Sequence, residues 1–581
     1  MSPSKDKPTD MRRDREQALA LDRRRILAMT PEQARDAIVD HPYPVTLVQS
    51  MAEEDLYLLI HTMGPDDALP VLELASNAQW AYLLDMETWS RDRIDPLGLT
   101  QWLSRLLKAD PDRFTHWIVS DQADLLQYYL HCHVQLHVRE YEQDPAEIGE
   151  GYFSDDDVHF IRLRDFANPG DISGQRREER DFFLKDLLKR ISIFDYRLHQ
   201  SLLLASAGVI PAEMEEELLR LRSIRLAEKG FLPFEEAVGV YQALQPEDLR
   251  HRRQKPASAG GRPVESYPLP VPSEKPPKNA DLFTRTLFQV ADGAAFQRLQ
   301  TEFAGLCNQV IAADQIKVRD KSMLAHVVAK VSGYVSIGLE KAGQAAMDDT
   351  PYHHAHLIQD YLLVDIFRIG YGCALALKWQ ADHWKRKSWF DRAGLKPSFW
   401  GEAWLGVLGG LLIKKPLYFD NFTSGALYRE FKCLEDIQAT RRTLEEIIAF
   451  DDLLALMAIR SVAVDCDTFL TCQNLLLTLW ANHRMGGTDE GAPQPLVADQ
   501  FSRFFDTLWG GGRLPPRRLR PGLRDEFIDW LARRTGLSIQ DIAGRMGAAL
   551  ERLFQQLESE LAAVSAKDID PRYIQLFLVA R

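Results

Sequence analysis

Apolar residues recur every three or four positions along most of the chain. Between Leu47 and Leu84, leucines, methionines and aromatic residues follow this spacing, which is the period of one face of an α-helix. The predicted helices are about 8–14 residues long, and helices of that length cannot bury an apolar face alone. The pattern therefore predicts an all-α fold, an α-solenoid or superhelical stack of short helices.

Proline marks where several of these helices should begin. The pairs Thr30-Pro31, Gly64-Pro65, Asp95-Pro96 and Asp110-Pro111 each precede an amphipathic run. Proline suits the first helical turn because its missing N–H would be unpaired there anyway. A preceding threonine or aspartate can accept a hydrogen bond from the free N–H groups. We therefore expect a helix to start at each pair.

Longer and more apolar runs follow in the second half of the chain. They predict helices over residues 282–313, 323–346, 352–389, 400–413, 428–459 and 469–483. In the first half, residues 180–207 and 211–229 also have a helical pattern. Residues 152–153 and 159–163 are the exception, since they favour short strands.

Composition divides the chain into five parts. Residues 1–24 form a charged N-terminal tail, and residues 25–244 a helical-repeat domain. Residues 245–278 are rich in proline and glycine, which predicts an extended linker because proline removes backbone donors and few apolar side chains are present. A second, bundle-like helical domain is predicted over residues 279–490, and a C-terminal helical region over residues 495–581.

Charge and cysteine content narrow the possible partners and compartment. The 581 residues carry a net charge of −14, and an acidic surface repels phosphate backbones, which disfavours nucleic acid as a partner. Six cysteines without a Cys-x-x-Cys pair fit a reducing compartment. No apolar stretch approaches the ~20 residues that cross a bilayer, and the charged N-terminus is unlike a secretory signal. We expect a cytoplasmic location, and we leave the cofactors and the oligomeric state open.

Two histidines and an aspartate form the best metal candidate. If Pro351 opens a helix, His353, His356 and Asp360 are three and four residues apart and share one face. Two imidazoles and one carboxylate suit Fe(II), Mn(II) or Zn(II). The alternative is a polar helix N-terminus with solvated histidines.

Two further polar clusters have weaker patterns. One contains His133 and His137, which would lie one helical turn apart, together with His131, Cys132 and Glu140. The other is the acidic run 155–157 with His159, which could hold a divalent cation. For the first we favour histidines bonded to neighbouring helices, and for the second a solvated acidic loop.

Glycines suggest two more motifs. The stretches 406–410 and 509–513 do not fit a phosphate-binding loop, and they favour close helix packing and a flexible loop respectively. Residues 537–557 resemble a helix-turn-helix, in which Ala543 would let the helices cross and Gly547 would permit the turn. The second helix lacks the Arg, Lys and Asn side chains that usually contact bases, so we favour an ordinary helical hairpin.

Two family resemblances rest on short segments. Residues 42–145 resemble the cytoplasmic N-terminal helical domain of bacterial magnesium transporters, through Leu47-Val48, Leu56-Tyr57-Leu58-Leu59, Gly64-Pro65-Asp66-Asp67-Ala68-Leu69 and Leu83-Leu84-Asp85. This resemblance implies a helical domain, but no transport and no metal ligand. Nearly the whole chain resembles a bacterial family described only as a domain of unknown function, through Leu84-Asp85-x-x-x-Trp89-x-x-Asp92-Arg93 and Asp570-Pro571-Arg572-Tyr573. That resemblance implies no activity.

These observations favour a non-enzymatic helical-repeat protein that binds another protein, as an interaction or regulatory scaffold. The reason is an analogy from fold, because stacked helices present extended surfaces that commonly bind partners. Two alternatives remain. One is a metal-dependent enzyme or sensor that uses His353, His356 and Asp360. The other is a DNA-binding regulator that uses residues 537–557.

Overall fold

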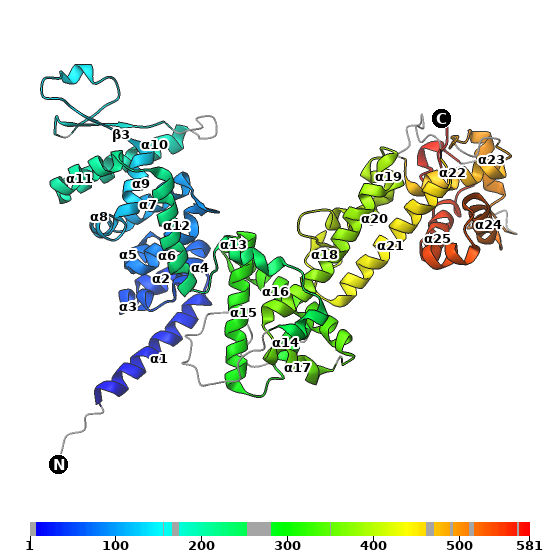
Figure 1. Ribbon diagram of the computed structural model, residues 1–581, viewed down its shortest axis with the longest axis horizontal. Coiled ribbons are helices and arrows are strands. Elements are labelled where there is room, and N and C mark those ends of the chain that lie inside the picture. Colours follow the sequence, from blue (N-terminus) through cyan, green and yellow to red (C-terminus); the bar gives the residue numbers. More distant parts are fainter. Residues whose placement is uncertain are drawn as a thin grey trace, which may run out of the picture. The chain divides into compact units, whose positions relative to one another are not determined.

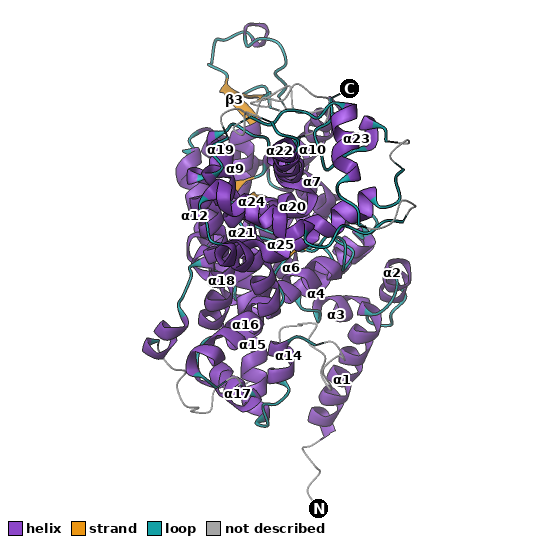
Figure 2. Cartoon of the chain, turned by 90° about the vertical axis from the view of Figure 1, so that its right-hand side faces the viewer, coloured by secondary structure: helices purple, strands orange, loops and turns teal. Residues whose placement is uncertain are grey.

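The protein is almost entirely helical. The computed structural model describes residues 7–154, 156–165, 174–252, 280–348, 350–459, 470–487, 492–510, 516–565 and 569–580. Within these residues, the strands form three short antiparallel pairs among many helices (Figures 1 and 2). The prediction of an all-α fold is confirmed.

The chain forms two compact units. Unit 1 lies within Met1–Val240 and Gln297–Val331, and unit 2 within Tyr241–Ala259, Glu274–Phe296 and Ser332–Arg581. The five-part division of the sequence stays a prediction. Most of the predicted linker lies outside the described residues.

Unit 1 is built from short helices and two small strand pairs. Its elements are α1 (Lys7–Leu27), α2 (Pro31–Val39), α3 (Pro44–Gln49), α4 (Glu53–Met63), α5 (Leu69–Leu74), α6 (Asn77–Glu87), β1 (Trp89–Ser90), β2 (Arg93–Ile94), α7 (Pro96–Ala109), α8 (Pro111–Ser120), α9 (Ala123–His133), β3 (Val134–Val138), β4 (His159–Leu163), α10 (Gly174–Phe194), α11 (Tyr196–Ala207), α12 (Pro211–Glu228) and α13 (Phe234–Ala237), with most of α15 (Gly293–Asp314) and the start of α16 (Lys321–Ala346).

Unit 2 contains the longer helices. Its elements are the rest of α16, a short 3-10 helix at Pro246–His251, α14 (Leu282–Leu287), α17 (Pro351–Asp360), α18 (Leu363–Lys387), α19 (Trp389–Arg392), α20 (Gly401–Leu411), β5 (Tyr418–Phe419), β6 (Tyr428–Arg429), α21 (Leu434–Leu456), α22 (Cys472–Arg484), α23 (Ala498–Asp506), α24 (Leu523–Thr535) and α25 (Ile539–Leu561).

Three of the four predicted helix starts are confirmed. Helices α2, α7 and α8 begin at Pro31, Pro96 and Pro111, and the aspartates before the last two accept hydrogen bonds from backbone N–H groups. The start predicted at Gly64-Pro65 is wrong. Gly64 has a φ of 91° and ends α4, and its carbonyl then accepts the N–H groups of a turn that leads to α5. Glycine takes this backbone conformation readily, so here the pair marks a helix end.

Several long predicted helices are divided. Range 282–313 contains α14 and α15, and range 352–389 contains α17, α18 and the start of α19. Capping explains two of the restarts. Asp292 accepts the N–H of Ala294 near the start of α15, and the buried Asp451 accepts the N–H groups of Trp389 and Phe390 at the start of α19. Range 428–459 begins as strand β6 before α21.

The predicted strand over residues 159–163 is confirmed as β4. Its partner is β3, which pairs Val134 with Leu163 and Val138 with His159. We predicted no strand for Val134–Val138, although Val134, Leu136 and Val138 alternate with polar residues, which is the strand period.

Close helix packing at residues 406–410 is confirmed. A Cβ at Gly406 would lie 2.4 Å from the ring of Phe419, and one at Gly410 would lie 2.4 Å from the carbonyl oxygen of Leu417. The glycines of α20 therefore let the segment leading into the β5–β6 pair approach the helix backbone. In the other predicted glycine stretch, residues 511–513 lie outside the described residues.

Among the described helices, α16 alone is long and apolar enough to cross a membrane by length and composition. Of its most apolar window, 61 % is buried inside the protein. A core helix has the same composition, so the helix is weak evidence for a membrane span.

Candidate functional site

A tight hairpin follows the end of α6 in unit 1. Strands β1 and β2 pair Trp89 with Ile94 and Ser90 with Arg93. The backbone at Arg91 has a φ of 63°, a left-handed conformation that costs a non-glycine residue roughly 1–2 kcal/mol. Backbone strain of this kind gathers at functional sites, because the surrounding structure must hold it in place.

The hairpin forms one wall of a cavity of about 560 Å³, which we call the hairpin pocket. Helix α12, residues 231–235 and residues 311–317 form the other walls. The lining combines an apolar wall with charged side chains, as in ligand pockets generally. The apolar residues include Trp89, Leu226, Phe231 and Ile311, and the charged ones are Arg91, Asp92, Asp95, Arg222, Glu235 and Lys317.

Asp85 fixes the arginines of α12 against α6. Its buried carboxylate accepts two hydrogen bonds from Arg225, both 2.7 Å long, and its main-chain oxygen accepts the Nε–H of Arg222 at 2.7 Å. The guanidinium of Arg222 also lies 5.4 Å from the centre of the Trp89 ring. Burial lowers the pKa of Arg222. Arg222 is therefore held in place at the pocket wall while Arg225 occupies the nearby carboxylate.

A buried glutamate ties the end of α6 to the segment after α15. The Glu87 carboxylate is 4 % exposed and accepts hydrogen bonds from Tyr57 Oη at 2.6 Å and Arg319 Nη2 at 2.9 Å, with His61 Nε2 at 3.3 Å. Burial alone would raise the pKa of Glu87, but these three donors lower it to about 2. The main-chain oxygen of Glu87 accepts the Nζ–H of Lys317, which places that lysine at the pocket.

The predicted metal residues lie together in unit 2. Helix α17 begins at Pro351 as predicted, and His353, His356 and Asp360 all line a second cavity of about 580 Å³. His251 of the 3-10 helix lines it too.

The side chains of that cavity have few contacts. His353 Nδ1 lies 3.7 Å from Asp348 Oδ2, and the ring of His356 packs edge-on against Tyr352. In the described part of the chain, no three His, Cys, Asp or Glu side chains are grouped so as to hold a metal ion. The metal role of His353, His356 and Asp360 stays a prediction.

The helical spacing predicted for His133 and His137 is wrong. Helix α9 ends at His133, and His137 lies on β3, where its Nε2 is 3.0 Å from Gln143 Oε1. His131 Nδ1 lies 2.8 Å from the main-chain oxygen of Ser206 in α11. These two histidines thus bond to neighbouring segments.

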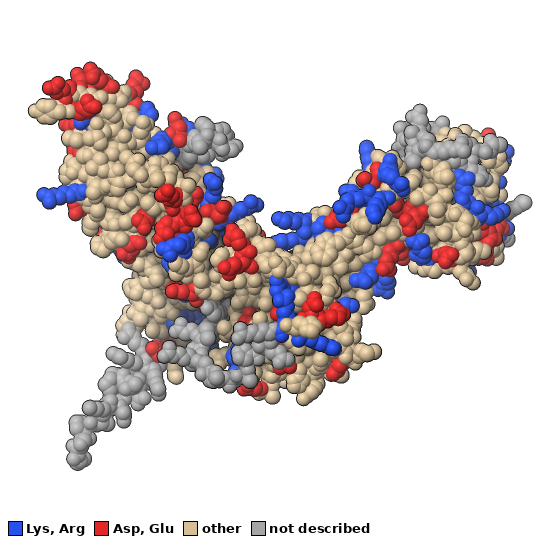
Figure 3. All heavy atoms as spheres, viewed as in Figure 1, with Lys and Arg blue, Asp and Glu red and all other residues tan. Residues whose placement is uncertain are grey.

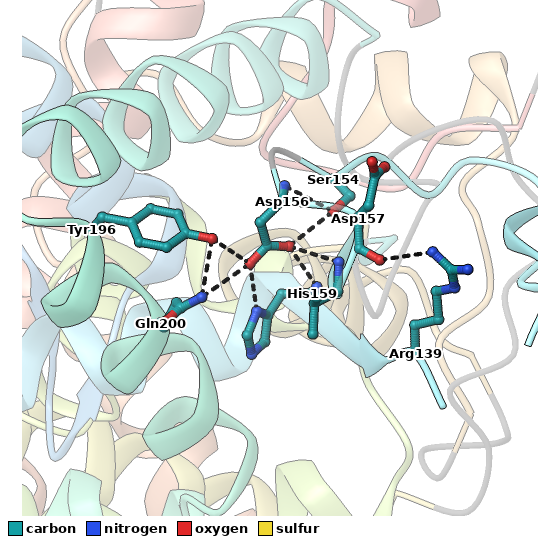
Figure 4. A network of polar contacts seen from close by, with 8 residues as sticks. Arg139, Ser154, Asp156, Asp157, His159, Tyr196 and Gln200 are labelled. Carbon is teal, nitrogen blue, oxygen red and sulfur yellow. Dashed lines mark hydrogen bonds and ion pairs between the residues drawn. The ribbon is translucent and has the colours of Figure 1, made fainter. Parts of the chain in front are cut away.

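In the acidic run 155–157, Asp156 is fully engaged by donors (Figure 4). Its carboxylate contacts His159 Nδ1 at 2.6 Å, Tyr196 Oη at 2.9 Å and Gln200 Nε2 at 3.2 Å, and it accepts two backbone N–H groups. Burial opposes ionisation, but these donors hold the pKa of Asp156 far below its ordinary value. Asp155 lies outside the described residues.

The helix-turn-helix alternative at the C-terminus is wrong. Helix α25 runs from Ile539 to Leu561 without a turn at Gly547. Met546, Leu550 and Leu553 are all buried, so one continuous apolar face holds the helix straight. Helices α24 and α25 form the ordinary hairpin that we favoured, joined at Gly536 with a φ of 77°.

Comparison with known proteins identifies the family. Residues 12–580 match a family described as a family of unknown function (DUF6178). The chain belongs to this family. No curated protein and no solved structure matches it.

The family match confirms the full-length resemblance. The resemblance to magnesium transporters stays a prediction. Within this DUF6178 protein, the segment Leu84-Asp85-x-x-x-Trp89-x-x-Asp92-Arg93 forms the end of α6 and the hairpin. It supplies Asp85, Trp89 and Asp92 to the hairpin pocket or its support.

Proposed function

We propose that this protein is a non-enzymatic, cytoplasmic helical-repeat protein whose unit 1 binds a partner protein at the hairpin pocket. The observation that carries the proposal is the construction of the pocket. The strained turn at Arg91 follows the end of α6, which the buried carboxylate of Asp85 ties to α12 and that of Glu87 ties to Arg319 in the segment after α15. Such support pre-organises a binding surface and reduces the conformational entropy that is lost on association.

Exposed apolar side chains at the pocket wall support a protein partner. Leu232 and Phe234 line the pocket and are 40 % and 41 % exposed, and Val238 follows at 39 %. Aromatic anchors beside a cavity are typical of the residues that dominate binding energy at protein interfaces. Their burial by a partner would also contribute the hydrophobic term, about 25 cal/mol per Å² of apolar surface.

Site-specific crosslinking tests the proposal. A photoreactive phenylalanine analogue replaces Phe234 in the full chain, and crosslinking is carried out in native cells. The matched control places the same analogue at Tyr141, which is fully exposed on the β3–β4 connection. We expect one recurrent protein adduct from position 234 that is absent from position 141. Adducts that are equal at both positions, or missing at both, would contradict the proposal.

A second candidate function rests on the cavity beside α17. His353, His356 and Asp360 line one cavity together with His251. This lining supports a metal-dependent enzyme or sensor as the second candidate function. Elemental analysis of the purified full chain tests it. One transition-metal ion per chain, lost in His353→Ala and retained in the exposed control His383→Ala, would support it. A wild-type chain without stoichiometric metal would end it.

A further inference from the structure

We infer that the hairpin pocket binds a carboxylate group of the partner protein, and that Arg222 is the residue that recognises it. This inference rests on the proposed function, because it names the chemistry by which the same pocket selects its partner. It follows from the position of Arg222, from the other charges of the pocket and from its apolar wall.

Arg222 is a fixed cation with unused hydrogen-bonding capacity. Its Nε–H is bonded to the main-chain oxygen of Asp85, and its Cζ lies over the Trp89 ring, 5.4 Å from the ring centre. The nearby carboxylate of Asp85 is occupied by Arg225 through both oxygens. The two Nη groups of Arg222 therefore have no carboxylate partner among the described residues. They form a planar pair of donors that matches a carboxylate in a bidentate arrangement.

Burial makes a neutralising ligand favourable. The lowered pKa of Arg222 reflects the cost of removing its charge from water. A ligand carboxylate restores a charge partner in a partly desolvated site, where an ion pair is stronger than at an open surface. Arg91 and Lys317 line the same pocket and add positive charge.

The acidic residues of the pocket favour a single negative charge. Asp92, Asp95 and Glu235 also line it and repel anions. Their repulsion of a doubly charged phosphate is about twice their repulsion of a singly charged carboxylate. The apolar wall at Phe231 and Ile311 accommodates an apolar side chain next to the carboxylate. The expected ligand is thus an apolar residue next to an acidic side chain or at a chain terminus.

Four small probes test this on the full chain by isothermal titration calorimetry. N-acetyl-phenylalanine presents a terminal carboxylate, and N-acetyl-phenylalanyl-glutamate α-amide presents a side-chain carboxylate. N-acetyl-phenylalanine amide is the neutral control, and inorganic phosphate is the competing anion. We expect at least one acid to bind more tightly than the neutral amide and phosphate. The acid that binds more tightly identifies the source of the carboxylate.

Variants of α12 assign the binding to Arg222. Arg222→Gln should lower the affinity for the acid by roughly tenfold or more, since a charge-assisted pair is lost. Arg222→Lys keeps the cation without the planar pair of donors and should lower the affinity by less. The matched control is Arg220→Gln, because Arg220 is exposed on the same helix, is paired with Glu217 and is not part of the pocket lining. Circular dichroism melting verifies that each variant is folded.

Several results would overturn the inference. They are equal binding of acid and amide, tighter binding of phosphate, no binding of either acid, or binding unchanged in both Arg222 variants. If the acids fail while crosslinking at position 234 succeeds, the partner docks without a carboxylate and only this inference falls. If the acids bind through Arg222 but no crosslink forms, the carboxylate site stands and the protein partner is what fails.

Discussion

At the scale of single residues, the hairpin pocket depends on buried charges whose partners are distant in the sequence. Arg222 bonds to Asp85 across 137 residues, and Arg319 bonds to Glu87 across 232. No local pattern connects such residues, so their contacts could not be predicted from the sequence. The family resemblance did draw attention to the segment around Trp89 and Asp92, and that segment lines the pocket.

Replacing Glu87 tests how strongly this network holds unit 1. In Glu87→Gln, the half-exposed Arg319 loses its counter-charge and the buried Tyr57 loses a charged acceptor, so we expect the free energy of unfolding at pH 7 to fall by about 2 kcal/mol. Chemical denaturation measures the change. Glu216→Gln on the exposed side of α12 is the control and should change stability little.

The same residue predicts a pH dependence. The folded state lowers the pKa of Glu87 from 4.5 to about 2, so its ionised form stabilises the fold. That contribution is complete above pH 4.5 and is lost as the pH falls through about 2. Denaturation curves across this window should show a smaller loss of stability in Glu87→Gln than in the wild type. Equal slopes would show that Glu87 is not the titrating group.

The strain at Arg91 gives a prediction of opposite sign. Relieving a left-handed arginine recovers roughly 1–2 kcal/mol, while glycine adds an entropy cost of about 0.5–1 kcal/mol. Arg91→Gly should therefore raise the free energy of unfolding by up to about 1 kcal/mol. Arg93→Gly, in the same hairpin but without a positive φ, should lower it. Thermal melting of both variants decides, and a loss of stability in Arg91→Gly would contradict the argument.

At the scale of elements, most helices could be predicted, and their ends only in part. The three-to-four residue spacing reports burial on one face, which holds wherever a helix packs on a neighbour. Proline adds the starts of α2, α7 and α8. The breaks near Asp292 and Asp451 depend on side chains that cap one specific N–H group, and β3 depends on pairing with β4. Spacing alone carries neither kind of information.

Asp156 ties the β3–β4 pair to α11, through Tyr196 and Gln200 (Figure 4). Asp156→Asn removes the charge that attracts these donors, so amides in β3 and β4 should exchange hydrogen faster. Asp157→Asn is the control, since among the described residues Asp157 bonds through its main-chain oxygen, to Arg139, and not through its carboxylate. Hydrogen exchange with mass spectrometry measures both. Because the pKa of Asp156 is lowered, the wild type should show the same loosening only at acid pH, below the ordinary value of 3.8.

Helices α16 and α18 cross within unit 2 at two glycines. A Cβ at Gly370 would lie 1.9 Å from the carbonyl oxygen of Tyr334, and one at Gly338 would lie 2.0 Å from that of Ile366. These are backbone atoms, so Gly370→Ala must force the helices apart and should cost about 3 kcal/mol or more. In contrast, Gly547 in α25 has open space at its Cβ position. Gly547→Ala should raise stability by about 0.5–1 kcal/mol, since alanine favours a helix interior.

At the scale of the whole molecule, the family match from residue 12 to residue 580 includes both compact units. Net charge is a second property that belongs to the whole molecule. The net charge is −14, and on the face drawn in Figure 3 both acidic and basic side chains are exposed. An acidic protein of this kind repels polyanions at long range, so any anionic partner must be recognised by fixed local cations such as Arg222.

The charge distribution predicts that the full chain does not bind duplex DNA nonspecifically. The exposed cations of Lys385, Arg386 and Lys387 lie in the last turn of α18, where they also offset the negative end of the helix. Fluorescence anisotropy at low salt, where phosphate contacts are strongest, should show no binding. If binding appears and is lost when all three cations become glutamine, a local patch outweighs the net charge. Long-range repulsion then does not prevent binding by this protein, although the carboxylate site at Arg222, which lies in unit 1, is unaffected.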